Sequence, residues 1–177
     1  MISDIQTARL TLRSMDRRVI TACMAGELDK ASVMLGVTIP DELLGHPSSL
    51  RYTLKQLDAD PLYLPWGARA IVLGQTMIGL IRFHSRPGPE YLREYAPDCV
   101  ELGYRIFTSY RRQGFALEAV EGMIRWAQSE FDTHHFIASI APENLPSLQL
   151  AARLGFKKIG ELVDEIDGIE HIYSLKV

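Results

Sequence analysis

The sequence predicts an α/β fold in which one domain, spanning residues 1–177, is built around a mixed β-sheet. Three observations lead to this prediction. Apolar runs with strand character alternate along the chain with stretches of helical periodicity. A chain of 177 residues has the length of roughly one domain and can bury one core. No internal repeat, low-complexity tract or Gly/Ser-rich linker divides it.

The first third of the chain is predicted to contain one strand and two helices. The segment Ala8–Arg13 alternates polar and apolar residues, as a half-buried strand does. A helix is expected over Asp16–Leu28, because its apolar side chains recur on one helical face. Gly36–Pro47 contains two prolines and two glycines and is expected to be a loop or a short helix. A second helix is expected over Ser48–Leu57, with Ser49 as its N-terminal cap.

The middle of the chain has the pattern of three strands. Gly67–Leu73 and Thr76–His84 are apolar runs separated by a Gly-Gln pair, which predicts a hairpin. Ser85–Asp98 contains three prolines and a glycine and is expected to be a long surface loop. Cys99–Phe107 then returns to strand character.

The last third contains the clearest helix. Over Phe115–Phe131, apolar residues recur at helical spacing. A short strand is expected over Phe136–Ile140, followed by a helix over Pro146–Leu154 that a glycine closes. Two final strands are expected over Phe156–Val163 and His171–Val177.

Composition excludes several classes of protein. Hydrophobic and charged fractions of 47% and 23% are ordinary for a globular protein and exclude disordered, collagen-like and coiled-coil chains. A net charge of −3 leaves no basic field for nucleic acid, and no apolar run is long enough to span a membrane. Cys23 and Cys99 cannot form a disulfide scaffold and are expected in the core, and no Cys/His cluster has zinc spacing. We therefore expect no metal. Because we also see no signal peptide, we expect a reduced, cytoplasmic location.

The turn between the strand Cys99–Phe107 and the long helix carries the chemical signal. Its residues Arg111, Arg112, Gln113, Gly114, Phe115 and Ala116 fit the pattern Arg/Gln-x-x-Gly-x-Gly/Ala. Such a turn directs unpaired backbone N–H groups outward at the positive end of a helix dipole, where a phosphate can bind. Taken alone, the pattern is more often a solvated turn than an anion site. Walker and Rossmann fingerprints are absent.

A second motif follows about 30 residues later. The segments ELGYRIF, RRQGFALEA and N-x-x-S-x7-G-F together resemble the GNAT superfamily of acetyl-CoA-dependent N-acetyltransferases. The opening TARLTLR, residues 7–13, is similar to the first strand of its RimJ/RimL-like branch. This resemblance implies a single GNAT domain over residues 1–177, with a mostly antiparallel sheet of about seven strands and about four helices.

The resemblance also implies roles for individual residues. The turn would hold the coenzyme A pyrophosphate by its N–H groups, and the end of the preceding strand would pair with the pantetheine arm. The implied cofactor-binding residues are Ile106, Phe107, Arg111, Arg112, Gln113, Gly114, Phe115, Ala116 and Asn144. Glu101 would lie beside the thioester as a base or a base relay, and Ser147 near the sulfur.

One position departs from the family pattern. Many members carry a tyrosine four residues before the glycine of the Gly-Phe pair, where this chain has Ala151. Ser147 is the nearest substitute as proton donor, although it fits equally well as a residue of the helix N-terminus. Tyr104 is expected to pack in the core. His84 ends a strand that would face the active site in this fold, and one interpretation is that it contacts the substrate.

The implied reaction is direct attack of a primary amine on acetyl-CoA in a ternary complex. The acceptor would be a protein N-terminal α-amine or a small amine, and the protein would act as a monomer or a homodimer. The alternative is a weakly catalytic coenzyme-A-binding sensor or interaction module, which the alanine at position 151 favours.

Overall fold

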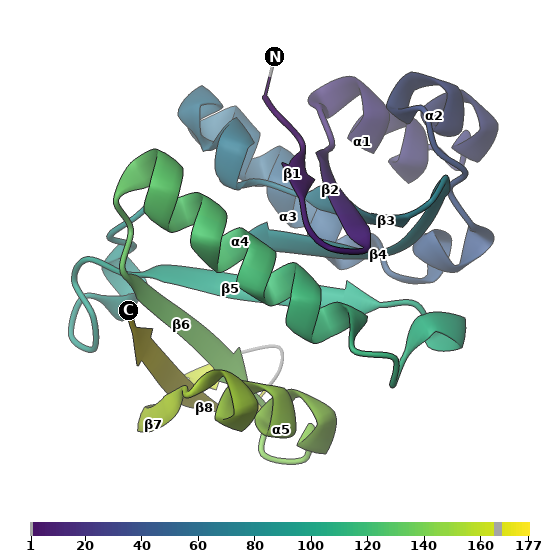
Figure 1. The fold of residues 1–177 in the computed structure, drawn as a ribbon. Coiled ribbons are helices and arrows are strands. Elements are labelled where there is room, and N and C mark those ends of the chain that lie inside the picture. The colour runs from purple at the N-terminus through teal and green to yellow at the C-terminus, as the bar shows by residue number, and fades with distance from the viewer. Residues whose placement is uncertain (1, 165–167) are drawn as a thin grey trace.

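The computed structural model describes residues 2–164 and 168–177 (Figure 1). Within these residues, eight strands form one sheet in the order β1-β2-β3-β4-β5-β6-β8-β7. The strands are β1 Ile5–Gln6, β2 Leu10–Ser14, β3 Arg69–Leu73, β4 Thr76–Phe83, β5 Val100–Ile106, β6 His135–Ile140, β7 Lys157–Asp164 and β8 Gly168–Lys176. The α-helices are α1 Arg17–Met24, α2 Leu28–Leu35, α3 Pro47–Ala59, α4 Phe115–Phe131 and α5 Leu145–Leu154. Short 3-10 helices are η1 Asp41–Gly45, η2 Pro61–Trp66, η3 Glu90–Leu92 and η4 Thr108–Tyr110.

The sheet is mixed and mostly antiparallel, which confirms the predicted class. Every neighbouring pair of strands is antiparallel except β5 and β6, which run parallel. Their ladder consists of two register pairs, Val100 with Phe136 and Glu101 with Ile137. Beyond Glu101 the two strands separate. The sheet therefore splits between β5 and β6, with a normal ladder on each outer side.

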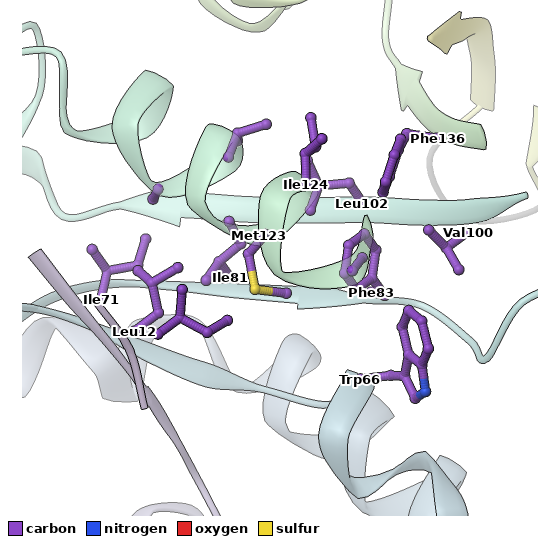
Figure 2. Packing of buried hydrophobic residues seen from close by; sticks show 14 of the residues in the cluster. Leu12, Trp66, Ile71, Ile81, Phe83, Val100, Leu102, Met123, Ile124 and Phe136 are labelled. Atoms are coloured by element: carbon purple, nitrogen blue, oxygen red, sulfur yellow. The ribbon is translucent and has the colours of Figure 1, made fainter. Parts of the chain in front are cut away.

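Two apolar clusters cover the two faces of the sheet. Because side chains alternate along a strand, Ile71 on β3 packs into one cluster while Ala70 and Val72 pack into the other. The first cluster lies under α4 and includes Phe83, Met123 and Phe136 (Figure 2). The second lies under α1, α2 and α3. The helices therefore fix the sheet, and with it the split, from both sides.

The strongest sequence patterns gave the right elements. The α4 helix spans Phe115–Phe131 as predicted, and α5 ends at Gly155, which takes a left-handed conformation with φ 87°. The hairpin between β3 and β4 turns at Gly74, with φ 61°. Each of these elements combines a clear periodicity with a glycine or an apolar run.

The eight strands and five α-helices of the described residues are close to the predicted numbers of about seven and about four. Two details of the prediction were wrong. Of the helix predicted over Asp16–Leu28, only Arg17–Met24 is helical as α1, which ends before Gly26 with φ 76°, and the next helix, α2, which starts at Leu28, was not predicted. Ser49 does not cap α3, which begins earlier at Pro47; its Oγ accepts a hydrogen bond from Arg82 Nε at 2.9 Å.

Candidate active site

A cavity of about 460 Å³ lies at the split between β5 and β6. Its walls come from β4, β5 and β6, from α3, and from α4 and α5. Helix α3 lies on one face of the sheet and α4 and α5 on the other (Figure 1). The residues that line the cavity therefore come from both faces of the sheet, at the place where the ladder stops.

The turn before α4 presents unpaired backbone donors. Arg112 and Gly114 both have left-handed conformations, with φ 61° and 81°. No side chain caps α4, and the backbone N–H groups of residues 112–117 donate no hydrogen bond to another described residue. These groups gather at the positive end of a 17-residue helix dipole. The arrangement fits a phosphate or pyrophosphate group.

Two side chains of the predicted turn, those of Arg111 and Gln113, help to hold its shape. Arg111 Nε donates to the carbonyl of Ile106 at 2.9 Å, and Gln113 Nε2 donates to the carbonyl of Ser109 at 3.2 Å. The Phe115 side chain is buried, whereas Arg112 is exposed. The turn therefore offers its backbone N–H groups to an anion, and the exposed Arg112 side chain lies in the same segment.

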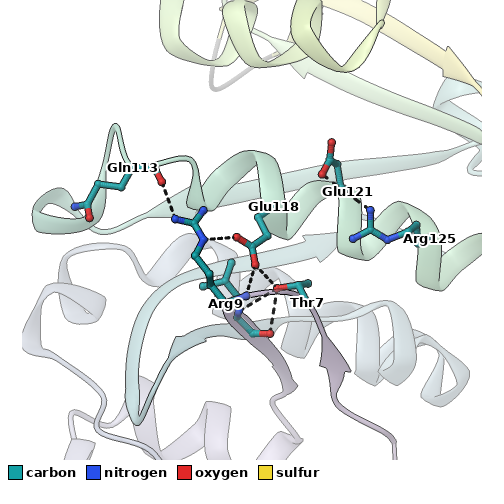
Figure 3. Close-up of polar contacts among 7 residues, drawn as sticks. Thr7, Arg9, Gln113, Glu118, Glu121 and Arg125 are labelled. Carbon is teal, nitrogen blue, oxygen red and sulfur yellow. Dashed lines mark hydrogen bonds and ion pairs between the residues drawn. The ribbon is translucent and has the colours of Figure 1, made fainter.

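A polar clamp from the N-terminal segment fixes the first turn of α4 (Figure 3). Glu118 accepts hydrogen bonds from Thr7 Oγ1, Arg9 N and Arg9 Nε, each at 2.6 Å. The Arg9 guanidinium also donates to the carbonyl of Gln113 and lies 4.5 Å from the ring centre of Phe115. Burial raises the pKa of Glu118, but the donors from Thr7 and Arg9 outweigh burial and hold that pKa below its usual range. Sequence reasoning gave these residues no role in the site.

The edge of β5 that faces the split is formed by Tyr104 and Ile106. On the other edge, the Glu101 carbonyl accepts from the His84 N–H, and the Phe107 N–H donates to the Ile78 carbonyl. Odd-numbered residues of β5 therefore point their backbone groups toward β4, and even-numbered residues point theirs away from it. Phe107 also accepts from the Tyr110 N–H, and its side chain is buried. Contrary to the prediction, neither backbone group of Phe107 faces the split. Tyr104 takes its place beside Ile106.

Ser147 and Tyr104 meet inside the cavity. The Tyr104 hydroxyl donates to Ser147 Oγ at 3.2 Å, and both residues line the cavity. Asn144 caps α5 with its Oδ1, which accepts from the Ser147 N–H at 3.3 Å. Ser147 therefore contributes its backbone to the cap, while its hydroxyl is directed to the cavity. Burial raises the pKa of Tyr104, which keeps the phenol protonated. Tyr104 packs partly on the core, as expected, but its hydroxyl belongs to the site.

Glu101 is enclosed rather than open to the cavity. Its residue exposure is 5%, Tyr91 donates a hydrogen bond to its carboxylate, and His84 Nδ1 lies 3.3 Å from Oε2. Burial raises the pKa of Glu101, but the hydrogen bonds and charge of His84 and Tyr91 outweigh burial and lower the pKa to about 2. His84 itself lines the cavity. Of the two residues, the histidine is the one that a substrate can touch.

The cysteines are core residues, as expected. Cys23 and Cys99 are buried, and burial raises the pKa of their thiols to about 11 and about 12. Among residues 2–164 and 168–177, no three His, Cys, Asp or Glu side chains are grouped to hold a metal ion. The same part of the chain has no helix long and apolar enough to cross a membrane.

Comparison with known proteins identifies the family. Residues 9–157 match the model of the acetyltransferase (GNAT) domain. A curated relative, the [ribosomal protein uS5]-alanine N-acetyltransferase of Escherichia coli (strain K12), is 39% identical over an alignment of 116 residues, and the match covers 53% of this chain and 60% of that protein. The match to the N-acetyltransferase YnaD of Bacillus subtilis (strain 168) covers 41% of that protein, so the chain spans only part of the length of these relatives.

Solved structures share the fold over almost the whole chain. RimJ of Mycobacterium smegmatis, in complex with a coenzyme A disulfide, has a TM-score of 0.68 at 18% identity, covering 99% of this chain and 88% of that one. RimL, an acetyltransferase of ribosomal protein L7/L12 in complex with coenzyme A, has a TM-score of 0.67 at 17% identity, covering 99% and 98%. Sequence and fold therefore agree, and the chain belongs to the GNAT family of acetyltransferase domains.

Proposed function

We propose that this chain is an N-acetyltransferase that moves an acetyl group from acetyl-CoA to a primary amine. The observation that carries the proposal is the cavity at the β5–β6 split, which the Tyr104–Ser147 pair lines. A thioester placed there is open to an amine from one face of the sheet and to a proton donor from the other. The uncapped start of α4, which follows β5 in the chain, supplies a place for the pyrophosphate.

In this proposal, acetyl-CoA is a cosubstrate held largely by backbone groups. The N–H groups of the turn, residues 111–116, hold the pyrophosphate, and those from Arg112 onward are unpaired among the described residues. The N–H of Ile106, on the edge of β5 that faces the split, pairs with the pantetheine arm, since the Ile106 carbonyl already accepts from Arg111 Nε. The Asn144 amide nitrogen donates to a pantetheine carbonyl while its oxygen caps α5. The Tyr104 N–H, which faces the split, is the donor for the thioester oxyanion.

The acetyl group passes directly from the thioester to the amine. The thioester is already activated, and the two buried thiols with raised pKa values cannot act as acyl carriers. When the carbon–sulfur bond breaks, the thiolate needs a proton. Ser147 donates it, and the Tyr104 hydroxyl, which points at Ser147 Oγ, replaces the proton that Ser147 gives up. Tyr104 on β5 thus takes the role that a tyrosine at the position of Ala151 has in many family members.

We propose an α-amine as the acceptor, either a protein N-terminus or a small amine. An α-amine has a pKa near 7.7–8.0 against about 10.4 for lysine, so a larger fraction is neutral at pH 7. The uS5-alanine acetyltransferase and RimL are both named for ribosomal-protein substrates, which is consistent with a RimJ/RimL-like acceptor here. A monomer or homodimer in a reduced, cytoplasmic location, with no nucleic-acid partner, belongs to the same proposal.

An amine panel tests this function against the sensor alternative. Acetyl-CoA and the protein are mixed with peptides whose amino termini are free or blocked, and then with polyamines and aminoglycosides. Free thiol and acetylated product are followed together, the product by mass spectrometry. We expect peptides with free amino termini to react and blocked ones to be inert. Tight coenzyme A binding without acetylation of any amine would favour the sensor, and equal rates with blocked peptides would exclude the α-amine.

A further inference from the structure

We propose that His84 accepts the proton of the attacking amine and that Glu101 is a positioning residue that holds the His84 ring. The proposal rests on the N-acetyltransferase function proposed above and assigns its proton acceptor. It also revises the role expected for Glu101, which becomes the partner of the base and not the base itself.

The contact between the two side chains is direct. His84 Nδ1 lies 3.3 Å from Glu101 Oε2, and the side chains are 26% and 6% exposed. Their backbones are joined by a hydrogen bond of 2.8 Å from His84 N to the Glu101 carbonyl. When Nδ1–H faces the carboxylate, the neutral ring keeps its lone pair on Nε2. Among the described residues, Nε2 has no hydrogen-bond partner, and the ring lines the cavity.

Gly103 leaves the space that the His84 ring occupies. A Cβ placed on Gly103 would lie 2.5 Å from His84 Nε2. This puts Nε2 against β5 at the residue next to Tyr104, within the stretch of β5 that lines the cavity. The nitrogen that carries the lone pair is therefore beside the place assigned to the thioester.

Strand alternation places the acid and the base on opposite faces of the sheet. On β5, Glu101 and Gly103 share one face, while the next residue, Tyr104, points to the other and meets Ser147 of α5. His84 lies with Glu101 on the α3 side, where its ring centre is 5.6 Å from that of Tyr52. An amine that arrives from the α3 side thus meets His84, and a sulfur on the α5 side meets Ser147.

The proton balance follows this geometry. As the carbon–nitrogen bond forms, the amine nitrogen gives one proton to His84 Nε2. As the carbon–sulfur bond breaks, the thiolate takes one proton from Ser147, which Tyr104 replaces. Solvent then returns the proton from His84 to the tyrosine side, so that the enzyme is unchanged and the products are the amide and free coenzyme A.

Glu101 itself is poorly suited to accept this proton. Tyr91 and His84 both occupy its carboxylate, and it does not line the cavity. Its lowered pKa is consistent with a permanent anion that orients the ring. Tyr52 on α3 packs on the His84 ring, and Tyr91 donates a hydrogen bond to Glu101. The other charged or titratable residues that line the cavity are His46, Arg82, Tyr104, Arg105, Glu143 and Glu170.

The test measures kcat for the wild type, His84→Gln and Glu101→Gln, with a peptide substrate that the wild type acetylates. If the wild type acetylates no amine, the proposed function fails and the His84 role has no reaction to serve. If the wild type is active, we expect His84→Gln to lower kcat about a hundredfold, which is typical of a lost general base, with coenzyme A affinity unchanged. Glu101→Gln should lower kcat less. His134→Gln, on an exposed histidine at the far end of β6, is the matched control.

The pH profile separates proton transfer from a structural role. Ionisation of the amine affects wild type and variant equally, so it cancels in the ratio of their kcat/KM values. We expect this ratio to depend on pH, because a general base acts only in its unprotonated form. A ratio that is constant with pH, or a greater loss from Glu101→Gln than from His84→Gln, would overturn the proposal.

A second measurement needs no active variant. Nitrogen-15 NMR of the histidines in the wild-type protein reports which ring nitrogen carries the proton, and the spectrum of His84→Gln assigns the signal. We expect the neutral His84 ring to be protonated on Nδ1. Protonation on Nε2 would leave no acceptor toward the cavity and would contradict the proposal.

Discussion

Tyr104 and Ser147 join β5 to α5 across the split, with 3.2 Å between the tyrosine hydroxyl and the serine Oγ. The donor, Tyr104, lies on β5, and the acceptor, Ser147, lies in the first turn of α5. Both residues line the cavity between these two elements. This bond assigns the serine hydroxyl to the cavity, while the cap of α5 is made by Asn144.

Removing this pair should slow chemistry more than it weakens binding. We expect Ser147→Ala to lower kcat by roughly ten- to a hundredfold, because its hydrogen bond forms to charge that develops in the transition state. Tyr104→Phe should do the same to a smaller degree, and the double variant should lose no more than the two losses added. Steady-state kinetics with calorimetric coenzyme A titration measures both effects. Ser129→Ala, on the exposed end of α4, is the control. A fall in melting temperature with unchanged kcat would mean that Ser147 only supports the helix.

The turn before α4 should lose its affinity for coenzyme A when a side chain is added at Gly114. Gly114→Glu strains a residue with φ 81° and places a negative charge where the phosphates approach. We expect at least a tenfold weaker Kd by calorimetry, or about 1.4 kcal/mol. Gly26→Glu is matched to it, because Gly26 has φ 76° and open space around it. If both variants fold and bind coenzyme A equally well, the turn is not the anchor.

The clamp on Glu118 should stabilise both the fold and the cofactor site. Glu118 accepts three hydrogen bonds, one of them from a cation, with 14% of its side chain exposed. We expect Glu118→Gln to reduce the free energy of unfolding by about 1–3 kcal/mol and to weaken coenzyme A binding. Glu121→Gln is the control in the same helix, since the Glu121–Arg125 pair is exposed and 4.0 Å apart (Figure 3). Denaturation measures the loss of stability in both variants, and calorimetry measures the loss of coenzyme A affinity. Equal losses in Glu118→Gln and Glu121→Gln would show that the Glu118 contacts stabilise no more than an exposed surface pair.

Glu101 should make stability depend on pH in the acid range. Its pKa is lowered to about 2 in the folded protein, so its contribution is complete above the unfolded pKa of about 4.3 and is lost as pH falls toward 2. We expect the wild type to lose about 2 kcal/mol more than Glu101→Gln between pH 5 and pH 3. Urea denaturation at several pH values measures this difference. Parallel curves for the two proteins would show that the carboxylate is not stabilised by its neighbours.

The sequence predicted the elements whose signal is local. Helix α4 has a long apolar period, and α5 has an asparagine cap and a closing glycine, so both were placed within a residue or so. Strand β1 and helix α2 were not predicted, and a strand of two residues such as β1 is too short to show any periodicity.

The sequence could point to residues of the candidate site only where they lie within one motif. The turn with Gly114 and the Asn144–Ser147 helix start each lie in a continuous segment. The partner of Glu101 is His84 and that of Ser147 is Tyr104. Neither pairing could be predicted from the sequence, because each depends on which strand faces the split. Arg9 and Glu118 are 109 residues apart and meet only in the folded chain.

The most direct test measures the two products of one reaction. Wild type is mixed with acetyl-CoA and a peptide that has a free amino terminus, and thiol and N-acetyl peptide are quantified over time beside Ser147→Ala. We expect equal amounts of thiol and acetyl peptide from the wild type, no thiol before peptide is added, and much slower release of both from the variant. Thiol release without peptide, or coenzyme A binding with no acetyl peptide formed, would contradict direct transfer across the split.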